Sequence, residues 1–285
     1  MKKTTLKNDL AVTDTIKRHV KLFDVSGDTL IFIDISNSLY SYSISKSTIT
    51  HKKRLTGEVS QILIAFNKIF CLTSIGLQIL TLNLRDVLLL GLEKSGTIMN
   101  KSDQGLAIIN ELTNETHILK IEKPFSITVK TLFTPSVIDA CVGKEHTYYS
   151  TRDNKVIICS DNHIVNTIVD VNLISTRIFV YKDKLILADS YMGDPIRLIR
   201  IKDSNTGTLL NTLELSVLNS QNICLSDNRL IIKQPKELII YNLKTNNKIT
   251  KTIPINFESF KILATKNTLI VQSGTGLKIM HGFLK

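Results

Sequence analysis

Residues 229–255 read RLIIKQPKELIIYNLKTNNKITKTIPI, and this stretch decides the fold because it holds three short strands in succession. The runs RLIIK and ELIIYNL have strand length and are rich in Ile and Leu, and Gln234-Pro235 between them is a turn signal. The following KITKTIPI alternates apolar and polar residues, as a half-exposed strand does. Together with QNICLS at residues 221–226, these runs predict a small four-stranded antiparallel sheet.

This unit recurs along nearly the whole chain. Equivalents of Tyr241 in the third strand occur at steps of 38, 39, 40, 43, 39 and 39 residues, namely Tyr42, Leu80, Leu119, Cys159, Lys202, Tyr241 and Met280. A second-strand series has steps of 39, 37, 41, 38, 45 and 39 residues, namely Leu30, Ile69, Leu106, Thr147, Leu185, Leu230 and Leu269. The shared period predicts an all-β fold, a single seven-bladed β-propeller of four-stranded antiparallel blades. Rings of six or eight blades are the alternatives.

The expected propeller spans residues 1–285, with about 39 residues per blade from residue 19 onward. Residues 1–18 precede the first repeat strand, and the last unit ends after three strands. We therefore expect the N-terminal segment to close the ring, with residues 4–13 (TTLKNDLAVT) pairing with residues 277–283 (LKIMHGF). The first six units are expected to end at Leu55, Leu92, Thr134, Val171, Leu215 and Ile255.

The end of the third strand resembles a known repeat. The run LIIYNLKTNNK is similar to the end of a WD-repeat blade, in which an aromatic residue, an acidic residue and a Thr-Gly turn follow apolar residues; Tyr241, Asn242 and Thr245 occupy those positions. The chain has no Trp and no Gly-His pair, so the polar network of that family is not carried over. The resemblance, to a divergent WD-repeat-like propeller, implies a rigid scaffold that binds other macromolecules. Another seven-bladed family is an alternative.

Composition and motifs narrow the classes of function. No stretch approaches the roughly 20 apolar residues of a membrane span, and the N-terminus lacks a signal-peptide core, so we expect a cytoplasmic or nuclear protein without membrane contact. The four cysteines form no C-x-x-C pair and fall in expected strands, which predicts buried free thiols. No nucleotide-binding, nucleophile or zinc motif occurs. We therefore expect no catalytic residue, cofactor, metal or small-molecule ligand.

The fifth unit is the longest and suggests a protein contact. Its extra residues include SYMGDPI at residues 190–196, between its second and third strands. Loops at this position of a propeller blade lie on the same side as the links between blades. We expect Tyr191, Met192 and Asp194 to project there, where an exposed Tyr-Met pair suits a protein interface. A longer turn with Met192 packed on its own blade is the alternative.

The formal charge of +11 predicts a basic sector on the rim. Outer-strand regions carry Lys52, Lys53 and Arg54 on the first blade, Lys248 and Lys251 on the sixth, and Lys2, Lys3 and Lys7 on the expected closing strand. Closure of the ring makes these blades neighbours. Such residues protect exposed strand edges from pairing with other chains, or they contact the phosphates of nucleic acid.

Taken together, the sequence favours a non-catalytic protein-protein interaction scaffold within a larger macromolecular complex. Its contact surface is expected on the side of the links between blades. An RNA-associated subunit, acting in RNA modification or ribosome assembly through the basic sector, is the alternative. A propeller hydrolase or lyase would require carboxylates or histidines that converge on the axis.

Overall fold

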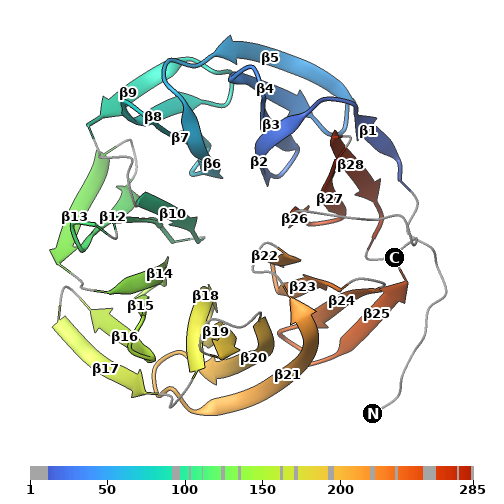
Figure 1. Cartoon of the computed structure of the whole chain (residues 1–285). Helices are drawn as coiled ribbons and strands as arrows, with labels where there is room; N and C mark the ends of the chain where they lie inside the picture. Colours follow the sequence, from blue (N-terminus) through green and yellow to red (C-terminus); the bar gives the residue numbers. More distant parts are fainter. Residues whose placement is uncertain are drawn as a thin grey trace.

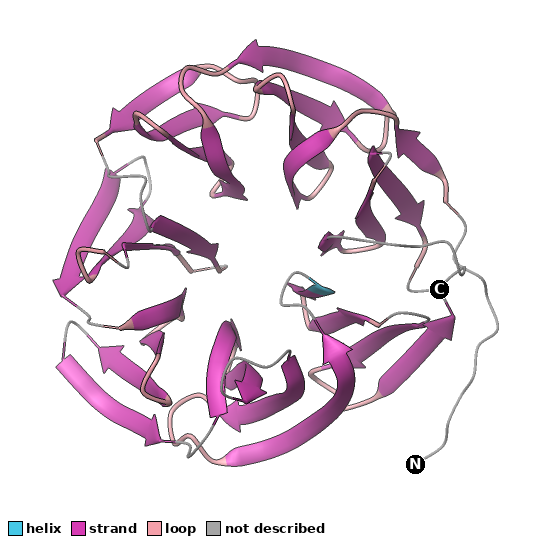
Figure 2. Ribbon diagram, viewed as in Figure 1, coloured by secondary structure: helices cyan, strands magenta, loops and turns pink. Residues whose placement is uncertain are grey.

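The computed structural model describes residues 12–91, 97–102, 104–110, 112–122, 126–133, 136–160, 163–169, 173–191, 196–218, 222–234, 237–252, 261–274 and 276–283. Regular structure in these residues consists almost entirely of strands joined by short turns (Figure 2). None of them belongs to a helix that is long and apolar enough to cross a lipid bilayer.

Seven four-stranded antiparallel sheets form blades around a central axis (Figure 1). In blades 1 to 6 the strands run in chain order from the axis to the rim. Blades 1 to 3 contain β2 (Val20–Ser26), β3 (Thr29–Asp34), β4 (Ser38–Ser43), β5 (Thr48–Arg54); β6 (Val59–Ala65), β7 (Lys68–Thr73), β8 (Gly76–Thr81), β9 (Asp86–Leu90); β10 (Thr97–Lys101), β11 (Leu106–Asn110), β12 (Glu115–Glu122) and β13 (Ser126–Phe133).

Blades 4 to 7 repeat this arrangement, and blade 7 takes its outer strand from the N-terminal segment. Their strands are β14 (Val137–Val142), β15 (Thr147–Thr151), β16 (Lys155–Ser160), β17 (His163–Val169); β18 (Leu173–Tyr181), β19 (Lys184–Tyr191), β20 (Ile196–Asp203), β21 (Leu209–Leu218); β22 (Ile223–Ser226), β23 (Arg229–Lys233), β24 (Glu237–Asn242), β25 (Lys248–Thr252); β26 (Lys261–Thr265), β27 (Thr268–Ser273), β28 (Gly276–His281) and β1 (Asp14–Ile16). The outer strand of blade 5 thus ends at Leu218, beyond the expected Leu215.

The two repeat series of the sequence face each other across the second and third strands of every blade. The partners are Leu30 and Tyr42, Ile69 and Leu80, Leu106 and Leu119, Thr147 and Cys159, Leu185 and Lys202, Leu230 and Tyr241, and Leu269 and Met280. The prediction of seven four-stranded blades is confirmed, and the six- and eight-bladed alternatives are wrong.

The N-terminal segment closes the ring, as predicted, but through a later and shorter strand. Strand β1 pairs antiparallel with β28, with Asp14 opposite Ile279 and Ile16 opposite Leu277. The amide of Thr13 also donates to the carbonyl of Ile279 at 2.9 Å. The expected strand at residues 4–13 was therefore placed too early, and residues 4–11 of it lie outside the described residues.

The apolar core lies between the blades. Ile31 and Ile33 of blade 1 pack with Ile62 and Ile64 of blade 2, and similar clusters join the other neighbouring blades. Both faces of each blade are therefore covered, which explains strands that read as near-continuous apolar runs. The prediction of buried free thiols is confirmed, since all four cysteines are buried and unbridged.

Hydrogen bonds between inner strands tie neighbouring blades together near the axis. The Oδ2 atom of Asp24 accepts from the amide of Ile64 at 2.5 Å, and the Oε1 atom of Gln61 accepts from the amide of Met99 at 2.6 Å. These bonds satisfy backbone amides that the inner strands cannot pair within their own blades. The polar side chains of the inner strands thus fix how one blade sits on the next.

Candidate protein-interaction face

One side of the ring carries the links between blades together with the turns between second and third strands; we call it the link face. In blades 1, 2 and 3 these turns expose an aliphatic side chain. Ile35, Ile75 and Leu112 have exposed fractions of 76%, 46% and 64%. The equivalent turns of blades 4, 6 and 7 contain polar residues, Gly or Pro only. Three consecutive blades therefore present a set of aliphatic tips, which we name the apolar tips.

Each apolar tip lies in a turn that is stabilised by hydrogen bonds to a side chain at the end of the preceding strand. The Oδ1 atom of Asp34 accepts from the amides of Ser36 (3.0 Å) and Ser38 (3.1 Å). The Oγ1 atom of Thr73 accepts from the amide of Ile75 at 3.3 Å, and the Oδ1 atom of Asn110 accepts from the amide of Leu112 at 3.0 Å. Asp34, Thr73 and Asn110 each end the second strand of their blade. Such local bonds replace the missing ladder bonds and restrict the turn.

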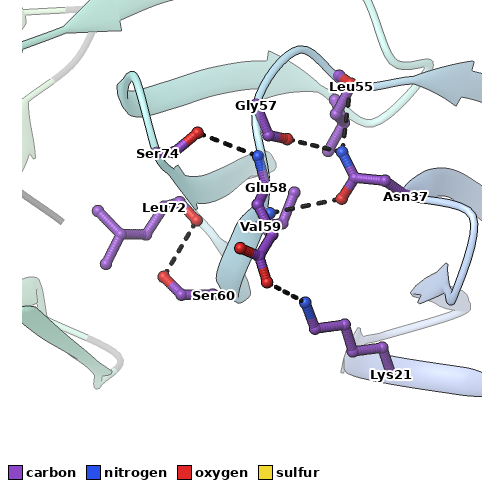
Figure 3. Close-up of polar contacts among 9 residues, drawn as sticks. All are labelled: Lys21, Asn37, Leu55, Gly57, Glu58, Val59, Ser60, Leu72 and Ser74. Atoms are coloured by element: carbon purple, nitrogen blue, oxygen red, sulfur yellow. Dashed lines mark hydrogen bonds and ion pairs between the residues drawn. The ribbon is translucent and has the colours of Figure 1, made fainter. Parts of the chain in front are cut away.

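The turns are also bonded to the links between blades (Figure 3). The Nδ2 atom of Asn37 donates to the carbonyls of Leu55 (3.3 Å) and Gly57 (2.6 Å). The amide of Glu58 donates to Ser74 Oγ at 3.1 Å, and the amide of Ser74 donates to the Glu58 carbonyl at 2.9 Å. In blades 1 and 2, these turns and the link therefore lie on one side of the ring, and the sequence-based expectation is confirmed there.

Charge on this part of the link face is paired. Lys21 and Glu58 form an exposed ion pair of 3.0 Å across blades 1 and 2. Burial would raise the pKa of Asp34, but hydrogen bonds from Ser36, Ser38 and Tyr40 outweigh it and lower the pKa below its usual value. Asp34 therefore stays ionised at neutral pH. Ile35 and Ile75 thus lie beside charges that other groups of the protein already compensate.

Of the three residues that we predicted from the sequence to contact a protein, the structure describes only Tyr191. Tyr191 is the last residue of β19, with Leu173 as its Cα partner in β18. Met192 and Asp194 lie outside the described residues. The sequence analysis missed Ile35, Ile75 and Leu112. Each of them is an aliphatic residue in a short turn that otherwise contains polar residues. This pattern could have predicted their exposure, because a short polar turn cannot bury an aliphatic side chain.

Among the described residues of the predicted basic sector, two lysines depart from the expectation of an exposed, unpaired charge. Lys52 and Arg54 on β5 are exposed, whereas Lys53 forms a 2.5 Å ion pair with Asp86 of blade 2. Lys248 is exposed on β25, but Lys251 is only 3% exposed, and desolvation lowers its pKa. The expectation that Lys251 lies on the surface is therefore wrong. Lys2, Lys3 and Lys7 lie outside the described residues.

Arg18 and Lys52, both exposed, contact the same aromatic side chain in blade 1, beside the closure of the propeller. The guanidinium of Arg18 lies 4.8 Å and the ammonium of Lys52 lies 5.4 Å from the centroid of the Tyr40 ring. The Nη1 atom of Arg18 also donates to the Tyr40 hydroxyl at 3.3 Å. Cation–π contacts of this kind hold charged side chains in place on a surface. In the basic sector, Arg18 and Lys52 are therefore brought close to each other by their shared contact with Tyr40.

The axis of the ring carries carboxylates, but their oxygens are engaged. Asp24 is buried and accepts from the Ile64 amide and from Lys101. Asp139 is buried and accepts from Ile178 N (2.8 Å), Ala140 N (3.0 Å) and Asn100 Nδ2 (2.9 Å). Burial raises the pKa of the Cys224 thiol to about 12, so it is a poor nucleophile at neutral pH. Among the described residues, no group of three His, Cys, Asp or Glu side chains could hold a metal ion.

Comparison with known proteins establishes the fold alone. No protein-family model and no curated protein matches the chain. A chain in a crystal structure of the mitotic checkpoint complex is similar over 99% of this chain and 97% of its own length, with a TM-score of 0.74 and 12% identity. Hsv2 of Kluyveromyces lactis has a TM-score of 0.62 and 11% identity, over 88% of this chain and 89% of its own length. The computationally designed Ika8 protein has a TM-score of 0.63 and 9% identity, over 95% of this chain and 99% of its own length. The WD-repeat resemblance of residues 238–248 therefore remains an expectation, whereas the seven-bladed propeller is shown.

Proposed function

We propose that this protein is a non-catalytic scaffold that binds a partner protein through the apolar tips of its link face. The observation that carries the proposal is the exposure of Ile35, Ile75 and Leu112 at equivalent turns of three neighbouring blades. Exposed aliphatic side chains on adjacent elements are typical of interaction sites, because removing apolar surface from water is favourable by about 25 cal/mol per Å².

The rigidity of these turns supports the same function. Bonds from Asp34, Thr73 and Asn110 shape each turn, and in blades 1 and 2 further bonds join the turns to the link. Ordering a loop on binding costs free energy, so a surface that is already ordered loses less of its contact energy. A propeller chain within the mitotic checkpoint complex gives a precedent for this fold in an assembly.

The non-catalytic part of the proposal rests on the axis. A general base needs a carboxylate or imidazole that can reach a substrate proton. Asp24 and Asp139 are almost fully buried and already accept hydrogen bonds from backbone amides. Cys224, with its raised pKa, lacks the thiolate that nucleophilic catalysis requires.

Differential capture from the native cell tests the proposal. The bait would be the wild-type chain, a variant with Ile35→Ser, Ile75→Ser and Leu112→Ser, and a control with Ile164→Ser, Val165→Ser and Val169→Ser on β17. The control residues are comparably exposed, at 52–65%, but lie on the outer strand of blade 4. We expect one or more proteins to be retained by the wild type and the control and lost by the apolar-tip variant. Equal retention by all three would refute this function for the apolar tips.

A further inference from the structure

A groove opens on the rim of the propeller where blades 7 and 1 meet. Its volume is about 440 Å³. One wall consists of residues 14–18, which form β1 and the start of its link to β2; the other consists of Tyr42 and residues 47–49 of blade 1. Figure 1 shows β1 beside the start of β5 at this point of the rim. We call this feature the closure groove.

Two adjacent cations line one end of the closure groove. Lys17 and Arg18 are exposed, and neither forms an ion pair with a residue that the structure describes. Among the same residues, the side chain of Arg18 donates one hydrogen bond, from Nη1 to the Tyr40 hydroxyl at 3.3 Å. A guanidinium carries five N–H donors, so Arg18 can also donate to a ligand in the groove.

The ring of Tyr40 positions Arg18 and brings a further cation close to it. Phe32 stacks on one face of Tyr40, with ring centroids 4.8 Å apart and ring planes 13° apart. The guanidinium of Arg18, at 4.8 Å from the Tyr40 centroid, and the ammonium of Lys52, at 5.4 Å, therefore share the opposite face. Neighbouring like charges repel each other, so an anionic group bound beside them would be stabilised.

The remaining lining is neutral or already paired. The carboxylate of Asp14 accepts from the Tyr42 hydroxyl and, at 2.7 Å, from the Thr15 amide. Exposed hydroxyl groups and an aliphatic side chain that is 41% exposed complete the lining, namely Thr15, Ser47, Thr48 and Ile49. The closure groove thus combines cations at one end with hydroxyl groups and an apolar side chain.

This lining distinguishes between classes of ligand. The groove is far larger than the roughly 30 Å³ that one water molecule occupies, so it accommodates more than a small ion. Nucleic-acid bases would find no aromatic face for stacking in it, because Phe32 and the two cations cover both faces of Tyr40 and Tyr42 is buried. A peptide offers carboxylates for the cations, main-chain groups for the hydroxyls and apolar side chains for Ile49.

We propose that the closure groove binds an extended acidic segment of a partner protein, with its carboxylates on Lys17 and Arg18 and an apolar side chain against Ile49. A guanidinium donates two parallel hydrogen bonds to a carboxylate, and an ammonium adds a point charge. The formal charge of +11 complements an acidic partner and disfavours a second copy of this chain. The closure groove is separate from the apolar tips, and the proposal does not rest on them.

Fluorescence anisotropy of a labelled peptide tests the closure groove. The probe is a short peptide of glutamate and leucine residues, and the same peptide with glutamine in place of glutamate is its control. We expect the whole wild-type chain to bind the glutamate peptide saturably. The glutamine peptide should bind about tenfold more weakly or worse, because it lacks the charged acceptors.

Variants locate the binding site. The groove variant, Lys17→Gln with Arg18→Gln, should bind the glutamate peptide about tenfold more weakly or worse, because two charge-assisted contacts are lost. Its matched control is Arg54→Gln with Lys248→Gln, which removes the same charges from exposed positions that do not line the groove. The control should bind as tightly as wild type. Ile49→Ser should weaken binding of this peptide but not of a peptide of glutamate alone.

Four results would overturn the proposal. One is wild-type protein that does not bind the glutamate peptide saturably, a result that does not depend on how any variant folds. Another is equal weakening in the groove variant and its matched control, which would indicate attraction to net charge alone. A third is undiminished binding by the groove variant. The fourth is an oligouridylate RNA that binds more tightly than the peptide and is lost in the groove variant. Circular dichroism verifies that each variant keeps the wild-type fold.

Discussion

At the scale of single residues, Asp34 couples the stability of the fold to pH. Its pKa is lowered in the folded protein, because hydrogen bonds from Ser36, Ser38 and Tyr40 outweigh the effect of burial. A carboxyl group of this kind stabilises the fold above its unfolded pKa, and this contribution is lost as the pH falls through the lower, folded pKa. Asp14 and Asp28 shift in the same direction.

We therefore predict that Asp34→Asn is less stable than wild type at pH 7 and that the difference narrows as the pH falls below about 4. Urea unfolding at pH values between about 7 and 2.5 measures both proteins. A difference in unfolding free energy that stays constant across this range would show that the Asp34 carboxylate is not preferentially stabilised in the fold. The Ile35 turn would then depend on other contacts.

Lys251 shows what residue-level reasoning can extract from a sequence. Within β25 a period of two places Lys251 on the same face as Ile249, which packs against the core between blades 6 and 7. That pattern alone predicts burial for Lys251 and exposure for Lys248, as the structure shows. Lys251 was predicted to be exposed because it is a lysine, although its position in the strand indicates burial. The contacts of Asp24 with the Ile64 amide and with Lys101, by contrast, depend on distances between blades that no local pattern contains.

At the scale of elements, closure of the ring depends on a strand of only three residues. Ile16 is buried among Phe23, Leu277 and Ile279, so it joins blades 7 and 1. A Cβ atom at Gly276 would overlap the carbonyl oxygen of Ile16, and Gly276 has a φ of 133°. Strand β1 therefore lies so close to β28 that only glycine fits at this position.

We predict that Ile16→Ala lowers the unfolding free energy by about 2–4 kcal/mol, as large-to-small core substitutions do. Gly276→Ala should destabilise the ring as well, because β1 must move away from β28. Thr15→Ala, at an exposed position of the same strand, is the control and should cost less than about 0.5 kcal/mol. Denaturant titrations measure all three. An Ile16→Ala effect no larger than that of Thr15→Ala would mean that β1 does not hold the ring closed.

The position of this strand also marks a limit of element-level prediction. Seven blades could be counted because two series of strand positions repeat with one period and, as the structure shows, are paired in register. The closing strand has no repeat and is too short for an alternation pattern to place it. Its register is set by Ile16, which fills space between two blades that are about 260 residues apart in sequence.

At the scale of the whole molecule, the described part of the rim carries less exposed positive charge than the sequence predicted. On the rim, Lys53 is neutralised by Asp86 and Lys251 is buried, so the described part of the predicted sector retains Lys52, Arg54 and Lys248, with Arg18 beside Lys52 on Tyr40. Lys52 and Arg54 are exposed on the edge strand β5, which suits protection against strand pairing. Edge protection is the role that the scaffold proposal gives to these charges, and contact with phosphates is the role that the RNA-associated alternative gives to them.

The salt dependence of RNA binding decides between these two functions. If the sector contacts phosphates of single-stranded RNA, each contact contributes about −0.7 to the slope of log K against log salt concentration. Lys52→Ala with Arg54→Ala removes two such contacts and should flatten the slope by about 1.4. Lys53→Ala is the matched control, because Asp86 already compensates that charge and its removal should change the slope little. A slope that both variants leave unchanged, in filter-binding or fluorescence titrations from about 50 to 300 mM salt, would remove the RNA-associated function and leave the rim charges as edge protection.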